Sequence, residues 1–190
     1  SARSAGETLQ EVLKECRPEE LPMALSIVSS ADEIDRLLQR MAFLLRATAD
    51  PPPLERLPMA ESISRVLQRL ERRLLLASVQ VLSARDWPAG EGVPGWTETI
   101  WWNLIGNALE HGHQVSRIWL QWEPDPTDPA WVTFWVRDDG VGVPASRLPR
   151  LFEPFDRLHL QTGGRGFGLP IVERLVRLQG GRCGYAPGGP

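Results

Sequence analysis

The stretch WWNLIGNALEHG, residues 101–112, contains the only two asparagines in the chain. Asn103 and Asn107 are four residues apart in an otherwise apolar run, so they share one face of a predicted helix. A neighbouring apolar row is expected to face the core: Ile100, Leu104 and Ala108. An asparagine offers a carbonyl oxygen and two N–H donors, which suit a hard cation and phosphate oxygens together. A buried amide pair bonded to the backbone is the alternative.

A second element, VRDDGVGVP, covers residues 136–144 and follows a predicted strand. By the alternation of that strand, Asp138 ends its core-facing row. A carboxylate there is costly to bury unless a group donates hydrogen bonds to it, as the amino group of adenine would. Gly140 and Gly142 leave room for a flat ring to approach the backbone. An ordinary Asp-Gly turn is the alternative.

The third element is GGRGFGLPIVERLVRLQGG, residues 163–181. Gly164, Gly166 and Gly168 lead into an amphipathic helix predicted over 168–179. Free N–H groups and the helix dipole make such a helix start suitable for an anion. No predicted strand leads directly into these glycines, so the spacing is not a dinucleotide-binding fingerprint.

Composition excludes several classes of function. The 190 residues carry 21 basic and 24 acidic side chains, spread without a basic patch, so no nucleic-acid partner is expected. No apolar run reaches the roughly 20 residues of a membrane span, so no membrane contact is expected within this sequence. Cys16 and Cys183 belong to no metal-binding or redox motif.

The proline-rich stretch DPPPLERLP, residues 50–58, predicts a domain boundary because proline interrupts helices. Residues 1–50 have the apolar spacing of a helical hairpin, which is expected to bury its stripe in a homodimer. A hairpin packed on its own globular domain is the alternative. Residues 51–190 are expected to form the second domain.

Within 51–190, helices and strands mix without a regular βαβ repeat. This order predicts a two-layer α/β sandwich, a mixed sheet with helices on one face. Helices are expected near 59–75, 97–111 and 168–179, and strands near 77–83, 117–122, 131–138 and from Arg182 onward. Trp119 and Trp135 are expected on the outer face of the sheet, either as a docking surface or stacked on Arg117 and Arg137.

Four stretches in this order resemble the N, G1, F and G2 boxes of the catalytic domain of bacterial sensor histidine kinases. They are NLIGNALEH, DDGVGVP, LFEPFDRL (151–158) and GGRGFGLPIVERLVRLQGG. The resemblance covers roughly residues 54–190 and implies the Bergerat fold of the GHKL ATP-binding superfamily. The hairpin at 7–48 resembles the dimerisation and phosphoacceptor domain of these kinases.

The resemblance implies ATP and Mg²⁺ as cofactors. Asn107 would ligate the metal, Asn103 would support the metal or the phosphates, and both would be catalytic. Asp138 would accept the adenine amino group. The full set of implied nucleotide-binding residues is Asn103, Asn107, Glu110, His111, Asp138, Gly140, Gly142, Gly164, Arg165, Gly166, Phe167, Gly168 and Leu169.

The implied activity is transfer of the γ-phosphoryl group to a histidine of the hairpin and then to an aspartate of a response regulator, in the cytoplasm. The only histidines are His111, His113 and His159. The acceptor is therefore expected a few residues before Ser1, with the chain truncated there, unless it has been lost. The end of the sequence is expected to lack a further strand of the domain.

Two details bear on the activity. Superfamily members that hydrolyse ATP carry Glu where this chain has Asn103, and an amide is no general base. Glu110 stands where kinases often have Lys or Arg, so it either changes a phosphate contact or is a solvated helix residue. A nucleotide-binding scaffold without chemistry and a related protein-serine kinase are the alternatives.

Overall fold

The computed structural model describes residues 51–111, 115–153 and 168–187, together with Met23. The chain divides into two compact units, Ser1–Asp50 and Pro51–Pro190, and all the described residues except Met23 belong to the second. The division follows Asp50, at the start of the proline-rich stretch. The predicted dimerisation hairpin lies outside the described residues.

The main sheet has the order β2-β4-β5. Its strands are β2 (Gln80–Ser83), β4 (Arg117–Pro124) and β5 (Val132–Asp138). β2 runs parallel to β4, and β4 pairs antiparallel with β5 in a register that sets Ile118 opposite Asp138. A separate antiparallel ribbon joins β1 (Glu55–Pro58) to β3 (Ala89–Gly92). The sheet is therefore mixed, as predicted.

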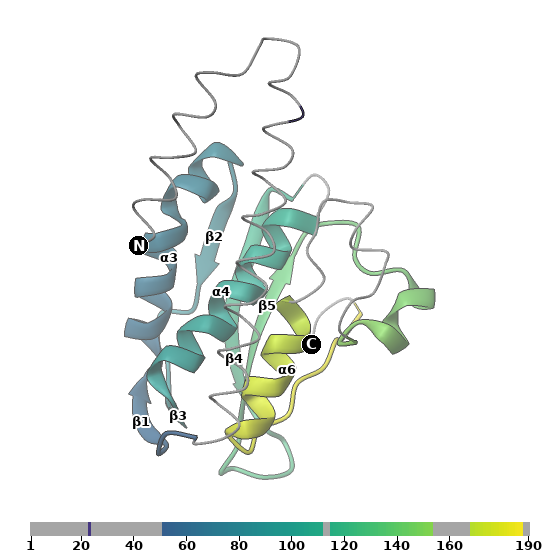
Figure 1. Cartoon of the computed structure of the whole chain (residues 1–190). Helices are drawn as coiled ribbons and strands as arrows, with labels where there is room; N and C mark the ends of the chain where they lie inside the picture. The colour runs from purple at the N-terminus through teal and green to yellow at the C-terminus, as the bar shows by residue number, and fades with distance from the viewer. Residues whose placement is uncertain (1–22, 24–50, 112–114, 154–167, 188–190) are drawn as a thin grey trace. The chain divides into compact units, whose positions relative to one another are not determined.

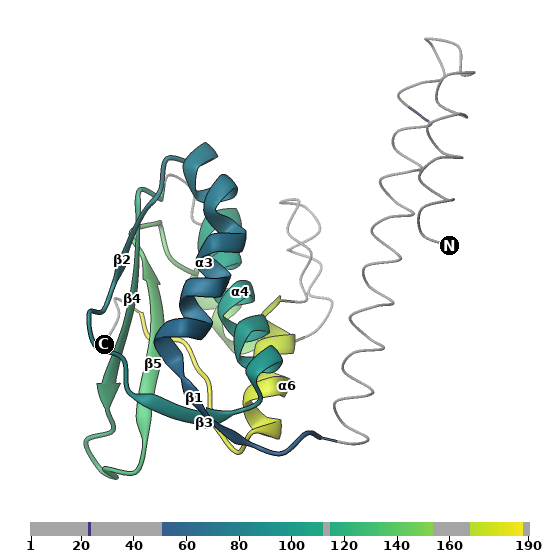
Figure 2. The ribbon, with the colours of Figure 1, turned by 90° about the vertical axis from the view of Figure 1, so that its left-hand side faces the viewer.

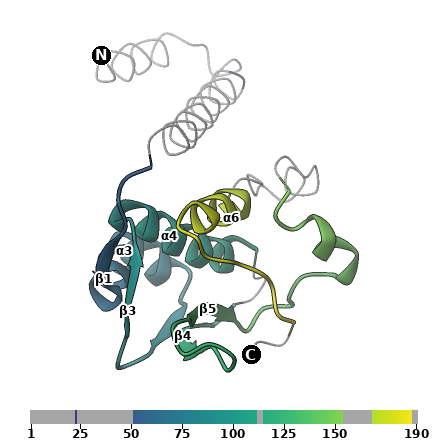
Figure 3. The same cartoon turned by 90° about the horizontal axis from the view of Figure 1, so that it is seen from below.

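Three helices cover one face of this sheet, as Figures 1 and 2 show. They are α3 (Met59–Leu76), α4 (Pro94–His111) and α6 (Gly168–Leu178). Seen from below, the helices form one layer and β4 and β5 the other (Figure 3). A short 3₁₀ helix, η1 (Ala145–Arg150), follows the glycine turn after β5. The predicted two-layer α/β sandwich is confirmed.

The core lies between the two layers. Its fully buried side chains include Val66 and Leu70 of α3, Ile105 of α4, and Ile118 and Leu120 of β4. Apolar residues at helical spacing on α3 and at period two on β4 place these side chains inward. Burying one such side chain stabilises the fold by about 1.5–3 kcal/mol.

Three aromatic rings pack against one another at the core. Trp87, Trp101 and Phe134 pack with centroids 5.7 to 6.3 Å apart. The Trp101 indole N–H donates to the Met59 sulfur at 3.2 Å. Trp101 thereby anchors α4 to both α3 and β5.

The structure corrects the inward row of α4. Trp101, Ile105 and Ala108 are buried, whereas Ile100 and Leu104 of the predicted row are half-buried. Because α4 lies between α3 and α6 and over the sheet, most of its circumference is apolar and the pattern leaves its rotation ambiguous.

The strand predicted from Arg182 onward is wrong for the residues described there, which form no strand through Ala186. Glycines at 181 and 184 weaken strand formation.

On the outer face of the sheet, the guanidinium groups of Arg117 and Arg137 both lie over the Trp119 ring, at 5.9 and 5.7 Å from its centroid. Arginine stacking thus accounts for the position of Trp119 on this face.

None of the helices in the described ranges has the length and apolar composition to cross a membrane.

Candidate functional site

The asparagines of α4 face the first residue of α6. A Cβ atom added to Gly168 would lie 3.2 Å from the Asn103 Oδ1 atom and 3.3 Å from the Asn107 Oδ1 atom. Two amide oxygens from successive turns of α4 therefore converge on the beginning of α6. Glycine at 168 makes this approach possible, because a side chain there would press on both oxygens.

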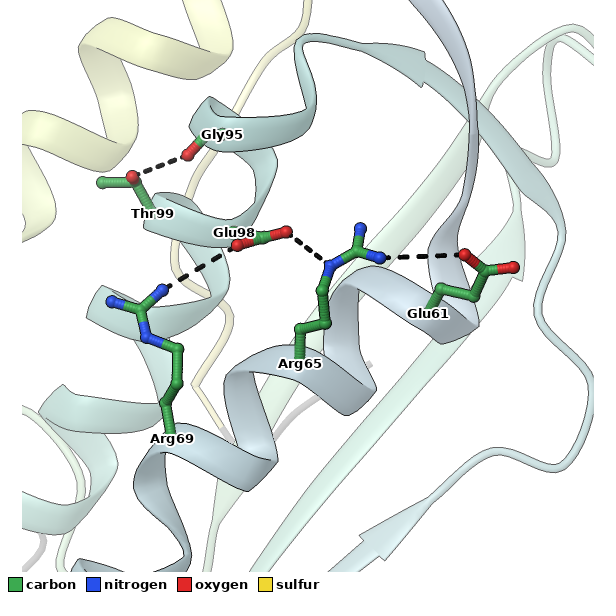
Figure 4. Close-up of polar contacts among 6 residues, drawn as sticks. All are labelled: Glu61, Arg65, Arg69, Gly95, Glu98 and Thr99. Atoms are coloured by element: carbon green, nitrogen blue, oxygen red, sulfur yellow. Dashed lines mark hydrogen bonds and ion pairs between the residues drawn. The ribbon is translucent and has the colours of Figure 1, made fainter.

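The orientation of Asn103 is fixed by the backbone of its own helix. Its Nδ2 atom donates to the Thr99 carbonyl at 2.7 Å, one turn earlier. The Thr99 hydroxyl in turn donates to the Gly95 carbonyl at 2.7 Å (Figure 4). The alternative of a backbone-bonded amide therefore holds for the N–H₂ group of Asn103, which binds the backbone. It does not hold for the Oδ1 atom, which faces Gly168.

Asp138 ends β5 on the face that the helices cover. Val136, two residues earlier, packs against the core. The Asp138 Oδ1 atom accepts the Gly140 amide at 2.9 Å, and within the described ranges no group donates to Oδ2. Gly142 follows with φ of 71°, a conformation that favours glycine. The Asp-Gly turn is therefore present, and it holds the carboxylate in one orientation through Oδ1.

The neighbouring Asp139 has a structural role. Its carboxylate accepts the Ser116 hydroxyl, the Ser116 amide and the Arg117 amide at 2.5 to 2.9 Å. These bonds tie the end of β5 to the start of β4. Donation by the Ser116 hydroxyl first, and then by the Arg117 amide, lowers the pKa of Asp139 from 3.8 to about 2.

This shift predicts a specific acid sensitivity. Because the pKa of Asp139 is lower in the folded state, the ionised carboxylate stabilises the fold above pH 3.8, and this contribution disappears as the pH falls toward about 2. Asp139→Asn should be less stable than the original chain at pH 6 and should lose less stability between pH 4 and 2. Urea unfolding at a series of pH values measures the difference. Parallel pH curves for the two chains would contradict the assignment.

Glu110 of α4 forms an ion pair with α3. Its Oε1 atom pairs with Arg73 of α3 at 2.9 Å, with both side chains well exposed. The interpretation as a solvated helix residue therefore accounts for its contacts. Position 110 is two turns beyond Asn103 on nearly the same stripe of α4, and its long side chain reaches Arg73, so its role as a nucleotide contact stays a prediction.

A larger ion-pair network also joins α4 to α3 (Figure 4). Glu98 of α4 accepts the Arg65 Nε–H at 2.7 Å and lies 3.8 Å from Arg69. Arg69 also stacks over the Trp102 ring at 4.8 Å. Such exposed pairs contribute at most about 1 kcal/mol each, so they orient α4 more than they stabilise it.

Several predicted residues fall outside the description. Gly164, Arg165, Gly166 and Phe167 lie outside the described residues, and the side chain of His111 is not described. Leu169 lies in α6 next to Gly168 and is half-buried. The structure therefore brings together Asn103, Asn107 and Gly168. Asp138 and its turn lie separately at the end of β5.

The donor set indicates which metal could bind. The described residues contain no group of three His, Cys, Asp or Glu side chains arranged for a metal. Neutral amide oxygens fit a hard cation such as Mg²⁺, most of whose ligands are water molecules and phosphate oxygens. The two amide oxygens at Gly168 thus fit Mg²⁺ delivered with a phosphate ligand, and they fit zinc poorly.

Sequence reasoning missed two contacts at this site. Tyr185 holds the turn after β5, where its hydroxyl accepts the Val143 amide at 3.3 Å. Gln179 connects the other ends of α4 and α6. Gln179 lies near the end of the quoted stretch 163–181 and Tyr185 lies beyond it, but the sequence carries no signal for the partner of either side chain.

Comparison with known proteins gives matches over the same segments. The sequence model of the family described as "Histidine kinase-, DNA gyrase B-, and HSP90-like ATPase" matches residues 92–189. The alginate biosynthesis sensor protein KinB of Pseudomonas aeruginosa is 38% identical over 80 residues, which are 42% of this chain and 13% of KinB.

Two solved structures share the fold. Full-length ShkA, crystallised in complex with AMPPNP, gives a TM-score of 0.66 at 23% identity, over 87% of this chain and 35% of ShkA. The mycobacterial sensor histidine kinase MprB gives 0.55 at 27% identity, over 66% of this chain and 80% of that chain. The present chain thus spans a small part of KinB and about a third of ShkA.

Proposed function

Because the chain belongs to the family of histidine kinase-, DNA gyrase B- and HSP90-like ATPases, we propose that it binds Mg²⁺-ATP and acts as the catalytic part of a sensor histidine kinase. The observation that carries the proposal is the convergence of the Asn103 and Asn107 oxygens on Gly168. The fold that the chain shares with ShkA, whose structure holds AMPPNP, supports a nucleotide ligand.

The ATP phosphates would lie at the start of α6, where N–H groups without a helical partner and the helix dipole favour an anion. Asn107 would ligate Mg²⁺, and Asn103, fixed by Thr99, would contact the metal or a phosphate oxygen. The further phosphate contacts proposed are Gly164, Arg165, Gly166, Phe167, Gly168 and Leu169. Glu110 and His111 stay predictions as nucleotide contacts.

Asp138 would recognise the base. Its Oδ1 atom already accepts the Gly140 amide, so Oδ2 is the atom to accept the adenine amino group. Guanine presents a carbonyl there and would be repelled by the carboxylate. Gly140 and Gly142 would let the ring approach the backbone.

In the proposed reaction, a histidine ring nitrogen attacks the γ-phosphorus of ATP. A P–N bond forms, the bond to the oxygen bridging the β- and γ-phosphates breaks, and ADP leaves with the electron pair. Mg²⁺ would neutralise charge on the phosphate oxygens. The asparagines and the start of α6 contribute mainly by positioning the phosphates.

Asn103 favours phosphoryl transfer over hydrolysis. A carboxylate in its place could remove a proton from water, but an amide cannot. The Asn103 N–H₂ group is bonded to Thr99, and its oxygen is a weak base at any accessible pH. Water bound near the γ-phosphate would therefore gain no proton acceptor from this side chain.

The partners are also part of the proposal. A homodimer through residues 1–50 would present the acceptor histidine, and a response-regulator aspartate would receive the phosphoryl group. His111, His113 and His159 all lie in the second unit.

Labelling with γ-³²P-ATP and Mg²⁺ tests the activity, using the full-length protein. We expect protein-bound label that is stable in alkali and labile in acid, as a phosphohistidine is, with little release of free phosphate. Acid-stable label would support the protein-serine kinase instead. Tight nucleotide binding without any label would support a scaffold.

A further inference from the structure

Gln179 joins the ends of α4 and α6 that lie away from the asparagines. Its Oε1 atom accepts the Val93 amide at 2.7 Å, just before α4 begins at Pro94. Its Nε2 atom donates to the Leu175 carbonyl of α6 at 3.0 Å. One side chain amide thus binds the backbone of both helices.

The α4 end of this connection depends on Gln179. The Val93 carbonyl accepts the Trp96 and Thr97 amides, which starts the helix. Valine offers no side-chain cap, and Pro94 has no N–H to donate. The remaining polar group of Val93, its amide, binds Gln179, so this side chain determines where the first turn of α4 lies.

The α6 end is rigid. The Gly180 amide donates to the Arg177 carbonyl and the Gly181 amide to the Val176 carbonyl, with Gly180 at φ of 79°. This pattern is a Schellman motif, and it places Gln179 at the C-cap. The side chain of Gln179 therefore leaves the helix from a fixed backbone position.

Gly92 shows how closely the two ends approach. A Cβ atom at this position would lie 2.6 Å from the Gln179 Oε1 atom and 3.0 Å from the Thr97 hydroxyl. Only glycine leaves room for the glutamine. The far ends of the α4–α6 pair thus meet through Gln179 and Gly92, and the near ends meet through Asn103, Asn107 and Gly168.

We propose that Gln179 is a positioning residue of the nucleotide site, an inference that rests on the proposed function. The bond to Val93 fixes α4 against α6 at a distance along the helix of about 15 Å from Asn103 and about 21 Å from Asn107, at 1.5 Å per residue. A change of spacing or rotation at the far end would be transmitted along both helices, since they are closely packed. The two asparagine oxygens would then be displaced from the start of α6.

Two substitutions separate positioning from simple stability. Gln179→Met keeps the length of the side chain but accepts no hydrogen bond from Val93. Gln179→Glu keeps the acceptor and loses the donor to Leu175, so it weakens the end of α6 and preserves the bond to α4. Gln80→Met makes the same chemical change at an exposed position of β2 and serves as the control.

The test measures the dissociation constant for Mg²⁺-ATP by tryptophan fluorescence and the melting temperature by circular dichroism, on the same samples. We expect Gln179→Met to weaken binding about tenfold, since displacements near 1 Å at a site can cost more than this. Gln179→Glu should bind within about twofold of the original chain even though it melts lower. Gln80→Met should change neither value.

Equal affinities of the original chain and Gln179→Met would overturn the inference and leave the proposed function standing. So would equal losses of affinity in the Met and Glu variants that follow their melting temperatures, because Gln179 would then be merely structural. Absence of Mg²⁺-ATP binding by the original chain would overturn the proposed function and the inference with it. Should Gln179→Met not fold, Gly92→Ala takes its place, because it displaces the same oxygen.

Discussion

Replacing Asn107 with alanine is expected to weaken Mg²⁺-ATP binding about 100-fold and to reduce phosphoryl transfer at least as much. The variant removes an oxygen that faces the start of α6 and that we assign to the metal. A polar contact to a charged ligand contributes about 1.5–3 kcal/mol, and 1.4 kcal/mol corresponds to a factor of ten. Titration of tryptophan fluorescence and γ-³²P labelling measure the two effects.

Asn107→Ala should weaken binding and transfer without lowering the stability of the fold, because alanine is a better helix former than asparagine. Gln68→Ala removes an amide from the exposed side of α3 and should leave binding and labelling unchanged. An Asn107→Ala variant that binds Mg²⁺-ATP as tightly as the original chain would exclude Asn107 as a metal ligand. A variant that melts at a much lower temperature would indicate a structural role instead.

Asp138→Asn is expected to weaken ATP binding by about 10- to 100-fold, because the bond from the adenine amino group would no longer reach a charged acceptor. The variant should also discriminate less against GTP, since an amide can donate to the guanine carbonyl. The turn should persist, because the Asn Oδ1 atom can still accept the Gly140 amide. Competition titrations with ATP and GTP give both affinities.

Asp139→Asn is the matched control for this change. It alters the adjacent carboxylate, which binds Ser116 and Arg117, and should reduce stability while nucleotide affinity stays the same. Unchanged ATP and GTP affinities in Asp138→Asn would show that the base is recognised elsewhere. Loss of ATP binding in Asp139→Asn would show that the two aspartates had been assigned in the wrong order.

The sequence predicted the elements that carry the site because their periodicity is strong. The 3.6-residue period of α3 and α6 and the alternation of β4 and β5 follow from one buried face each. The strands β1 and β3 escaped prediction, since ERLP and AGEG show no alternation and pair only with each other. Short ribbons of this kind depend on tertiary contacts that no local pattern encodes.

Within the site, the pairing of Asn103 with Asn107 could be predicted, but the direction of Glu110 and the role of Gln179 could not. Glu110 is seven residues beyond Asn103 on nearly the same stripe of α4, and the direction of its long side chain, toward Arg73, follows from a contact with α3. Gln179 acts through a residue 86 positions earlier in the chain. The first contact depends on the packing of α4 against α3, and the second on the packing of α4 against α6.

The central claim is that nucleotide and metal bind between the asparagines of α4 and the start of α6. Crystals grown with AMPPNP and Mn²⁺, which accepts the same oxygen ligands as Mg²⁺, would test it directly by anomalous scattering. We predict a manganese peak about 2.1 Å from the Asn107 Oδ1 atom, with the adenine amino group on Asp138. A manganese peak bound to carboxylates elsewhere, or a nucleotide bound away from Gly168, would contradict the account.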